Sequence, residues 1–218
     1  MFQKTKTLSL GHLLTIDSLS RDTINHLIER AYEYAAPGDP PKHSPISNKI
    51  VANLFFEPST RTQYAFEIAA RKLQAISITP SIPNLSTLKG ESLLDTVHNF
   101  EAMGTSLFII RHAINHTPEF IASELYSNAK VLNAGDGTHQ HPSQCLIDLM
   151  TISQHFPDFS NLSVAILGDT FRSRVAHSIM SGLRTMGTTD IRLITPPPLV
   201  PNNQEQEQKQ KHEYLTST

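Results

Sequence analysis

The stretch IVANLFFEPSTRTQYAFE, residues 50–67, decides the fold because a strand, a turn and a helix start follow one another within it. A mainly apolar run predicts a buried strand over residues 50–56. Glu57-Pro58 ends that run, and a helical pattern follows over residues 62–75. The turn contains three hydroxyl side chains and one guanidinium, in Ser59-Thr60-Arg61-Thr62. The stretch therefore predicts a strand–turn–helix unit with polar groups at the end of the strand.

The same alternation continues on both sides of this stretch. Further strands are predicted over residues 76–78, 106–111, 130–134, 162–169 and 190–195, and helices over 21–35, 91–104, 117–125, 141–156 and 172–186. The segment LSVAILGD, residues 162–169, has the pattern of the most clearly buried strand. Strands that alternate with helices form βαβ units and parallel sheets. We therefore expect an α/β fold with a doubly wound, mostly parallel sheet, in which ligands bind at the carboxyl ends of the strands.

The chain divides into a complete first block and an incomplete second one. We expect an N-terminal domain over residues 1–145, a partial second α/β domain over 146–201, and a polar, disordered tail over 202–218. The helix predicted at 141–156 joins the two blocks. Because the second block has only two clear strands, it buries too little surface for an independent core. Uncovered apolar faces on those strands predict aggregation or dependence on a partner.

Composition narrows the classes of partner. The chain has 218 residues, of which 39% are hydrophobic and 17% charged, as in a folded protein that buries a core. The formal net charge of −2 gives no support for nucleic acid or an anionic membrane as a partner. A single cysteine, Cys145, excludes an internal disulfide and fits a reducing compartment. With no signal-peptide pattern and no apolar run of membrane-spanning length, we expect a cytoplasmic protein.

The hydroxyl-rich turn predicts an anion site. Backbone N–H groups at a helix N-terminus, the hydroxyls of Ser59, Thr60 and Thr62, and the guanidinium of Arg61 together suit a phosphate. The alternative is that Ser59 or Thr60 only caps the helix. A cap alone requires neither the arginine nor the additional hydroxyls, so we favour the anion site.

Two more strand ends have polar side chains. Arg111 ends the strand at 106–111, where it either faces a ligand or forms a structural salt bridge. The strand at 130–134 runs into NAGDGTHQHPSQ, residues 133–144, in which Gly135 and Gly137 allow a turn with positive φ. His141 and Gln144 lie three residues apart near the next helix N-terminus. There the histidine can donate to a carbonyl oxygen and the glutamine can accept from an amide.

Other polar residues are less specific. His139 and His141 could together suggest a metal site, but no third ligand has convincing spacing, so we predict no metal site. Arg174 lies at a second helix start that suits a carboxylate or phosphate, whereas Arg172 and Lys89 by themselves fit solvated positions. No nucleophile–base pair is evident. The pattern favours catalysis by positioning and electrostatic stabilisation over a covalent intermediate.

Five motifs in order resemble one enzyme family. The segments FFEPSTRT, LKGESLLDT, IIRH, VLNAGDGTHQHPSQCLIDLMTI and VAILGDTFRSRVAHS, within residues 8–201, are similar to the catalytic chain in the aspartate and ornithine carbamoyltransferase family. The ornithine branch shares the Ser-Thr-Arg-Thr type of turn and a His-Pro-x-Gln. The Asn-Ala-Gly-Asp-Gly stretch before His141-Pro142 resembles the aspartate branch instead.

The resemblance implies a reaction and a role for each matching residue. The amine of L-aspartate would attack the carbonyl carbon of carbamoyl phosphate, giving N-carbamoyl-L-aspartate and phosphate, a step of pyrimidine biosynthesis that needs no cofactor or metal. Carbamoyl phosphate would contact Ser59, Thr60, Arg61, Thr62, Arg111, His141 and Gln144, with Arg61, Thr62, Arg111 and His141 as the catalytic residues. Aspartate would contact Arg174 and Lys89. Because Lys89 would reach the site of a neighbouring subunit, a homotrimer with shared sites is implied, and a regulatory chain is a further partner that the family allows.

The chain departs from the family after Pro201. Members continue with more of the aspartate domain, so the resemblance implies a C-terminally truncated chain that keeps the carbamoyl-phosphate half-site and binds aspartate poorly. Two alternatives stay open. One is a non-catalytic carbamoyl-phosphate-binding or assembly subunit, and the other is a different carbamoyltransferase such as the ornithine enzyme.

Overall fold

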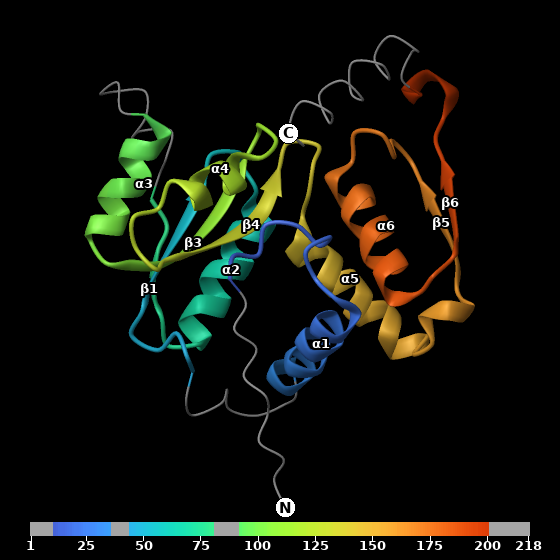
Figure 1. Ribbon diagram of the computed structural model, residues 1–218, viewed down its shortest axis with the longest axis horizontal. Coiled ribbons are helices and arrows are strands. Elements are labelled where there is room, and N and C mark those ends of the chain that lie inside the picture. Colours follow the sequence, from blue (N-terminus) through green and yellow to red (C-terminus); the bar gives the residue numbers. More distant parts are fainter. Residues whose placement is uncertain (1–10, 36–43, 81–91, 201–218) are drawn as a thin grey trace, which may run out of the picture.

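The computed structural model describes residues 11–35, 44–80 and 92–200 of the chain (Figure 1). The described elements are α1 (Arg21–Ala35), β1 (Ile50–Phe55), α2 (Thr60–Lys72), β2 (Ile76–Ile78), α3 (Leu93–Ala102), β3 (Thr105–His112), α4 (Thr117–Ser123), β4 (Lys130–Asp136), α5 (Pro142–His155), η2 (Phe159–Asn161), β5 (Ser163–Leu167), α6 (Arg174–Met186), β6 (Asp190–Ile194) and η3 (Pro197–Leu199). Each helix and strand predicted from the sequence is present, and only its ends differ.

Four strands form a parallel sheet in the order β2-β1-β3-β4. Alternate residues face opposite sides of a strand, and both sides of this sheet are buried. One side packs against α3 and α4 through Val97 and Ile121, and the other packs against α2 through Ala70. Helices on both faces of a parallel sheet define the doubly wound α/β fold that the sequence predicts.

The second sheet is smaller and open. It contains only β5 and β6, which pair in parallel. The prediction that residues 162–169 form the most clearly buried strand is wrong, because the residues of β5 alternate between exposed and half-buried. Its apolar sequence is that of a strand covered on both faces, but Leu167 remains 75% exposed. Leu193 and Ile194 of β6 are exposed as well, so the predicted uncovered apolar surface is present.

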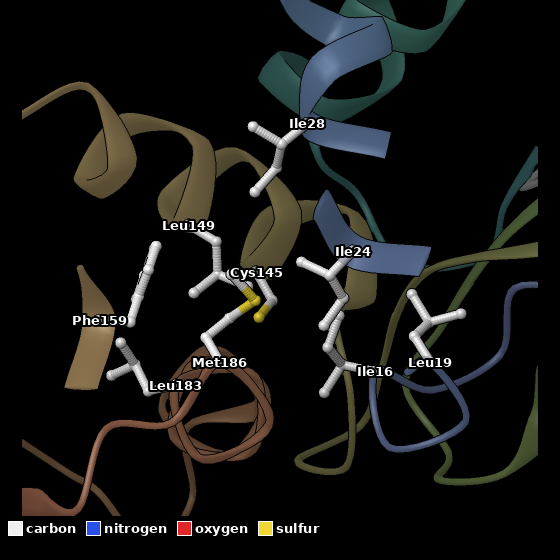
Figure 2. Close-up of a cluster of buried hydrophobic side chains, with 9 residues drawn as sticks. All are labelled: Ile16, Leu19, Ile24, Ile28, Cys145, Leu149, Phe159, Leu183 and Met186. Atoms are coloured by element: carbon white, nitrogen blue, oxygen red, sulfur yellow. The ribbon is translucent and has the colours of Figure 1, made fainter. Parts of the chain in front are cut away.

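A hydrophobic core lies between α1, α5 and α6 (Figure 2), and Val164 of β5 and Ile191 of β6 pack against it. Cys145 and Leu149 of α5 meet Leu183 of α6 in this core. The two helices approach closely at Gly182, where an added Cβ would lie 2.5 Å from Sγ of Cys145. The domain boundary predicted at 145/146 falls within α5, and the division of the chain into domains remains a prediction.

Some expectations lie outside the described residues, namely the placement of Lys89 and the disorder of residues 202–218. Among the helices that the structure describes, none is long and apolar enough to cross a membrane.

Candidate active site

The carboxyl ends of β1, β3 and β4 lie at one edge of the four-stranded sheet. Strand register places Phe55 of β1 opposite Arg111 of β3. At the end of β4, an added Cβ on Gly135 would lie 3.1 Å from Nη1 of Arg111, 3.1 Å from Nε of Arg174 and 3.3 Å from Cδ2 of His141. Three predicted site residues from β3, α5 and α6 therefore surround one glycine.

Gly135 and Gly137 shape this edge as the sequence predicts. Both have positive φ, of +113° and +42°. A Cβ on Gly137 would collide with Oδ1 of Asn115, at 1.9 Å. Only glycine therefore fits these two positions without displacing their neighbours.

Glu57 neutralises two of the gathered cations. Its Oε1 accepts hydrogen bonds from Nη2 of Arg111 at 2.7 Å and from Nη2 of Arg174 at 2.6 Å. Its Oε2 accepts from Nη1 of Arg174 at 2.9 Å. These bonds, chiefly those from Arg174, lower the pKa of Glu57 although partial burial opposes them. No role was predicted for Glu57, although a carboxylate at the end of the β1 run, close to an arginine-containing turn, was a signal that it balances a cation.

Arg111 keeps unused hydrogen-bonding capacity. It is 9% exposed, and besides Glu57 it donates to the carbonyl oxygen of Ala134 at 3.2 Å. Its Nε is buried and has no hydrogen-bond partner among the described residues. The salt bridge and the ligand-facing position, treated as alternatives from the sequence, are both compatible with this arrangement.

His141 is held as a neutral imidazole. Burial, followed by the charges of Arg111 and Arg174, lowers its pKa to about 4. Nδ1 lies 3.3 Å from the hydroxyl of Ser143, and the backbone N–H donates to Oγ of Ser178 at 2.8 Å. If the Ser143 hydroxyl donates to Nδ1, the ring proton is on Nε2. A neutral imidazole in that tautomer can polarise a carbonyl oxygen at neutral pH.

Gln144 is oriented by its neighbour. Its side-chain amide N–H donates to Oδ1 of Asp148 at 2.9 Å. This assignment leaves Oε1 of Gln144 as an acceptor for an amide N–H. The accepting role of Gln144 stays a prediction.

The hydroxyl-rich turn opens α2. Ser59 is at the N-cap position, but its side chain makes no capping hydrogen bond. Within the described ranges, no hydrogen bond or ion pair involves the side chains of Ser59, Thr60, Arg61 or Thr62, and Arg61 is exposed. A cap role for Ser59 is thus absent, and the donors remain available to an anion.

The loop between β4 and α5 is fixed by Asp136, a buried residue that the sequence did not single out. Oδ1 of Asp136 accepts from Nδ2 of Asn133 at 2.7 Å and from the backbone N–H of Gln140 at 3.1 Å. Its Oδ2 lies 2.9 Å from Nδ1 of His139. His139 therefore turns toward Asp136, whereas His141 turns toward the arginines, and the suggested His139–His141 metal pair is not formed.

Together these groups define a site for an anion joined to a polarised carbonyl. The arginines and the α2 N-terminus suit phosphate oxygens, and His141 suits a carbonyl oxygen. The class is a doubly wound α/β protein, and in this class ligands bind at the carboxyl ends of the strands.

The chain belongs to the aspartate/ornithine carbamoyltransferase family. Residues 11–154 match the model of that family's carbamoyl-P binding domain. The catalytic subunit of aspartate carbamoyltransferase from Coxiella burnetii strain Dugway 5J108-111 is 52% identical over 194 residues, which is 88% of this chain. The corresponding subunit from strain RSA 493 / Nine Mile phase I has the same identity and coverage.

Solved structures agree with the fold. Aspartate transcarbamoylase from Trypanosoma cruzi in complex with carbamoyl phosphate has a TM-score of 0.79 at 27% sequence identity and covers 94% of this chain. The same enzyme with N-(phosphonacetyl)-L-aspartic acid has a TM-score of 0.77 at 26% identity. This chain spans 62% of the length of the curated relatives and 66% of the chains in those two structures. The two-stranded second sheet is consistent with that partial coverage.

Proposed function

We propose that the chain binds carbamoyl phosphate and contributes to transfer of its carbamoyl group to the amine of L-aspartate, giving N-carbamoyl-L-aspartate and phosphate in pyrimidine biosynthesis. The observation that carries the proposal is the convergence of Arg111, His141 and Arg174 around Gly135 at the ends of the sheet strands. The donors of residues 59–62 lie at the N-terminus of α2. Since α2 follows β1 in the chain, they are near the same edge of the sheet. Membership of the carbamoyltransferase family supports this choice of ligand.

In this proposal, the turn at the start of α2 holds the phosphate. Ser59, Thr60, Arg61 and Thr62 supply hydroxyls, a guanidinium and backbone N–H groups for the phosphate oxygens. As the carbamoyl–oxygen bond breaks, charge develops on the leaving phosphate. Donors that are already in place stabilise that charge with little reorganisation.

The carbonyl end of carbamoyl phosphate lies toward Arg111 and His141. Neutral His141 and the guanidinium of Arg111, together with the hydroxyl of Thr62, donate to the carbonyl oxygen, and Oε1 of Gln144 accepts from the carbamoyl NH₂. Attack by the aspartate amine then places negative charge on an oxygen surrounded by donors. Arg61, Thr62, Arg111 and His141 are the proposed catalytic residues.

The aspartate half of the site is less complete. Arg174 is the proposed aspartate ligand within the described part of the chain, and both of its Nη atoms donate to Glu57. An aspartate carboxylate would compete with Glu57 for the same donors. Lys89, the second proposed aspartate contact, lies outside the described residues. We therefore propose that the 218-residue chain binds carbamoyl phosphate but binds aspartate weakly.

A turnover assay with a substrate panel tests the proposed function. The purified chain is given carbamoyl phosphate with L-aspartate, L-ornithine or neither, and ureido product and phosphate are measured. Slow turnover that is specific for aspartate and is lost in His141→Asn supports the assignment. Faster transfer to ornithine overturns it. Carbamoyl phosphate binding without any turnover favours the binding or assembly subunit, which the open β5–β6 sheet makes the second candidate.

Assembly and location form a further part of the proposal. We propose a homotrimer with shared sites and a cytoplasmic setting, and a regulatory chain as an additional partner. The buried, unpaired Cys145 supports a reducing compartment. Light scattering measures the oligomer: a particle of three chains fits the trimer, and a strict monomer contradicts it.

A further inference from the structure

A second cluster of ionisable side chains lies beside the proposed site but outside it. It consists of His116, Glu119 and His139, and one potential ligand atom of each lies within 4.8 Å of the other two. His116 and Glu119 belong to the start of α4, whereas His139 belongs to the loop between β4 and α5. The imidazole rings of His116 and His139 are 3.9 Å apart between centroids. Two segments that β4 separates in the chain thus converge on one small volume.

The carboxylate of Glu119 makes no hydrogen bond to any residue that the structure describes. Both of its oxygens are buried and without a hydrogen bond among the described residues. Oε1 lies 4.0 Å from Nδ1 of His116 and 3.8 Å from Nδ1 of His139, which is too far for a hydrogen bond. A desolvated carboxylate without a partner is costly. A cation between the three side chains would remove that cost.

Asp136 supports both histidines of the cluster. It is completely buried, its Oδ2 lies 2.9 Å from Nδ1 of His139, and the same oxygen accepts from the backbone N–H of His116 at 2.7 Å. Carboxylates placed behind metal-ligating histidines orient the imidazole and raise its basicity. The backbone of His116 has φ of +61°, an uncommon conformation for a residue other than glycine. That conformation places His116 at the N-cap of α4, with its ring against that of His139.

We propose that His116, Glu119 and His139 form a binding site for a divalent transition-metal ion of the Zn²⁺ type. Two imidazoles and one carboxylate are a ligand set that zinc accepts, with water in the fourth position. Zinc lies about 2.0–2.2 Å from such ligands, so three ligand atoms within 4.8 Å of one another can close on one ion with a small movement. Because Nδ1 of His139 is held by Asp136, the ring would offer Nε2 to the ion. The side chain of His116 is 54% exposed, which gives the ion a path from solvent.

A bound ion would connect α4 to a loop that leads into the proposed active site. It would tie α4 to the loop that leads into His141, two residues beyond His139. The alternative is a cluster held together by protons alone, in which protonated His139 is shared between Asp136 and Glu119. This metal proposal does not depend on carbamoyl transfer.

Metal binding by the full chain distinguishes a metal site from a cluster held together by protons. Calorimetric titration with Zn²⁺ is expected to give one site per chain, and Co²⁺ is expected to give the visible absorption of a low-symmetry, four-coordinate complex. His116→Ala, Glu119→Gln and His139→Asn should each weaken Zn²⁺ binding by at least about tenfold. His155→Ala, which changes an exposed histidine at the end of α5, should leave binding unchanged.

A folding control keeps the test decisive. Each variant is melted with EDTA and with Zn²⁺, so that the effect of the metal is measured within the same protein. Wild type and His155→Ala should melt higher with Zn²⁺, and the three cluster variants should not. Absence of Zn²⁺ binding by wild type at about 100 μM overturns the proposal, because structural zinc sites in proteins bind far more tightly than that. Equal binding by wild type and the three cluster variants overturns it as well.

Discussion

Glu57 and Arg174 form a two-point ion pair that joins the ends of the two sheets. Nη1 of Arg174 lies 2.9 Å from Oε2 of Glu57, and Nη2 lies 2.6 Å from Oε1. Glu57 follows β1, and Arg174 begins α6, 117 residues later. Since Arg111 donates to the same carboxylate, one anion balances the two cations that lower the pKa of His141. The ion pair therefore affects both the stability of the protein and the pKa of His141.

Replacing Glu57 should affect both the stability of the protein and the pKa of His141. Glu57→Gln leaves two largely buried guanidiniums without a counter-charge, so we expect a loss of about 2 kcal/mol in unfolding free energy at pH 7. The pKa of Glu57 is lowered in the folded state, mainly by Arg174, so its stabilisation is present above the unfolded pKa and lost as pH falls through the folded one. Urea unfolding at several pH values measures this effect.

A matched control for that variant is Glu33→Gln, which removes an exposed ion pair with Arg30 on α1. It should change stability by less than about 1 kcal/mol. NMR titration should also find the pKa of His141 lower still in Glu57→Gln, because the charge of Glu57 raises it. Equal stability of the two variants would contradict the ion-pair account.

The buried His141 should make the protein less stable in mild acid. Its folded pKa of about 4 lies below the ordinary histidine value of 6.5, so the unfolded chain binds more protons between these limits. Its contribution to stability is complete above about pH 6.5 and is lost as pH falls toward 4. The loss amounts to about 3 kcal/mol. Urea unfolding should therefore show a weaker pH dependence over this window in His141→Gln than in wild type, and identical slopes would refute the burial argument.

The contact between α5 and α6 should not tolerate a larger residue at Gly182. A Cβ there would lie 2.5 Å from Sγ of Cys145 and 3.0 Å from Cδ1 of Leu149. Gly182→Ala should cost about 1–3 kcal/mol through overpacking, despite the better helix propensity of alanine. In the background of Cys145→Ala, which removes the nearest atom, the cost should fall. A double-mutant cycle of thermal or urea unfolding measures this coupling, and strict additivity would show that the contact is not responsible.

The open face of the β5–β6 sheet should promote self-association. Leu167 is 75% exposed and Ile194 is 50% exposed. Leu167→Lys should lower the association of the chain in sedimentation experiments without lowering its melting temperature. Met103→Lys changes an isolated hydrophobic residue that is 66% exposed at the end of α3, and it should have no such effect. Equal behaviour of the two variants would show that the open sheet does not drive association.

Much of the architecture follows from local patterns in the sequence. Apolar runs alternating with helical stretches predicted the parallel sheet, because apolar residues recur with one spacing in a helix and with another in a strand. The positive φ of Gly135 and Gly137 was also predictable, since few other residues adopt it. The gathering of Arg111 and His141 follows from the parallel topology, which brings strand ends to one edge.

Other features depend on contacts between distant residues. The apolar sequence of β5 indicates a strand covered on both faces, and no local signal reveals that a cover is missing on one of them. The role of Glu57 depends on Arg174, far along the chain. The side chains that gather around His139, those of Glu119 and His116, come from the region of α4 and not from the neighbouring His141. Such partners become visible only when the fold brings the segments together.

Carbamoyl phosphate binding to the 218-residue chain tests the central claim most directly. Calorimetric or ³¹P NMR titration should show saturable binding at one site per chain, tighter than binding of inorganic phosphate because the carbonyl also has donors. Arg61→Ala should weaken that binding by at least about tenfold through loss of a charge-assisted hydrogen bond, whereas Arg71→Ala, at an exposed position on the same helix, should not. Absence of carbamoyl phosphate binding, or binding that Arg61→Ala leaves unchanged, would contradict the account.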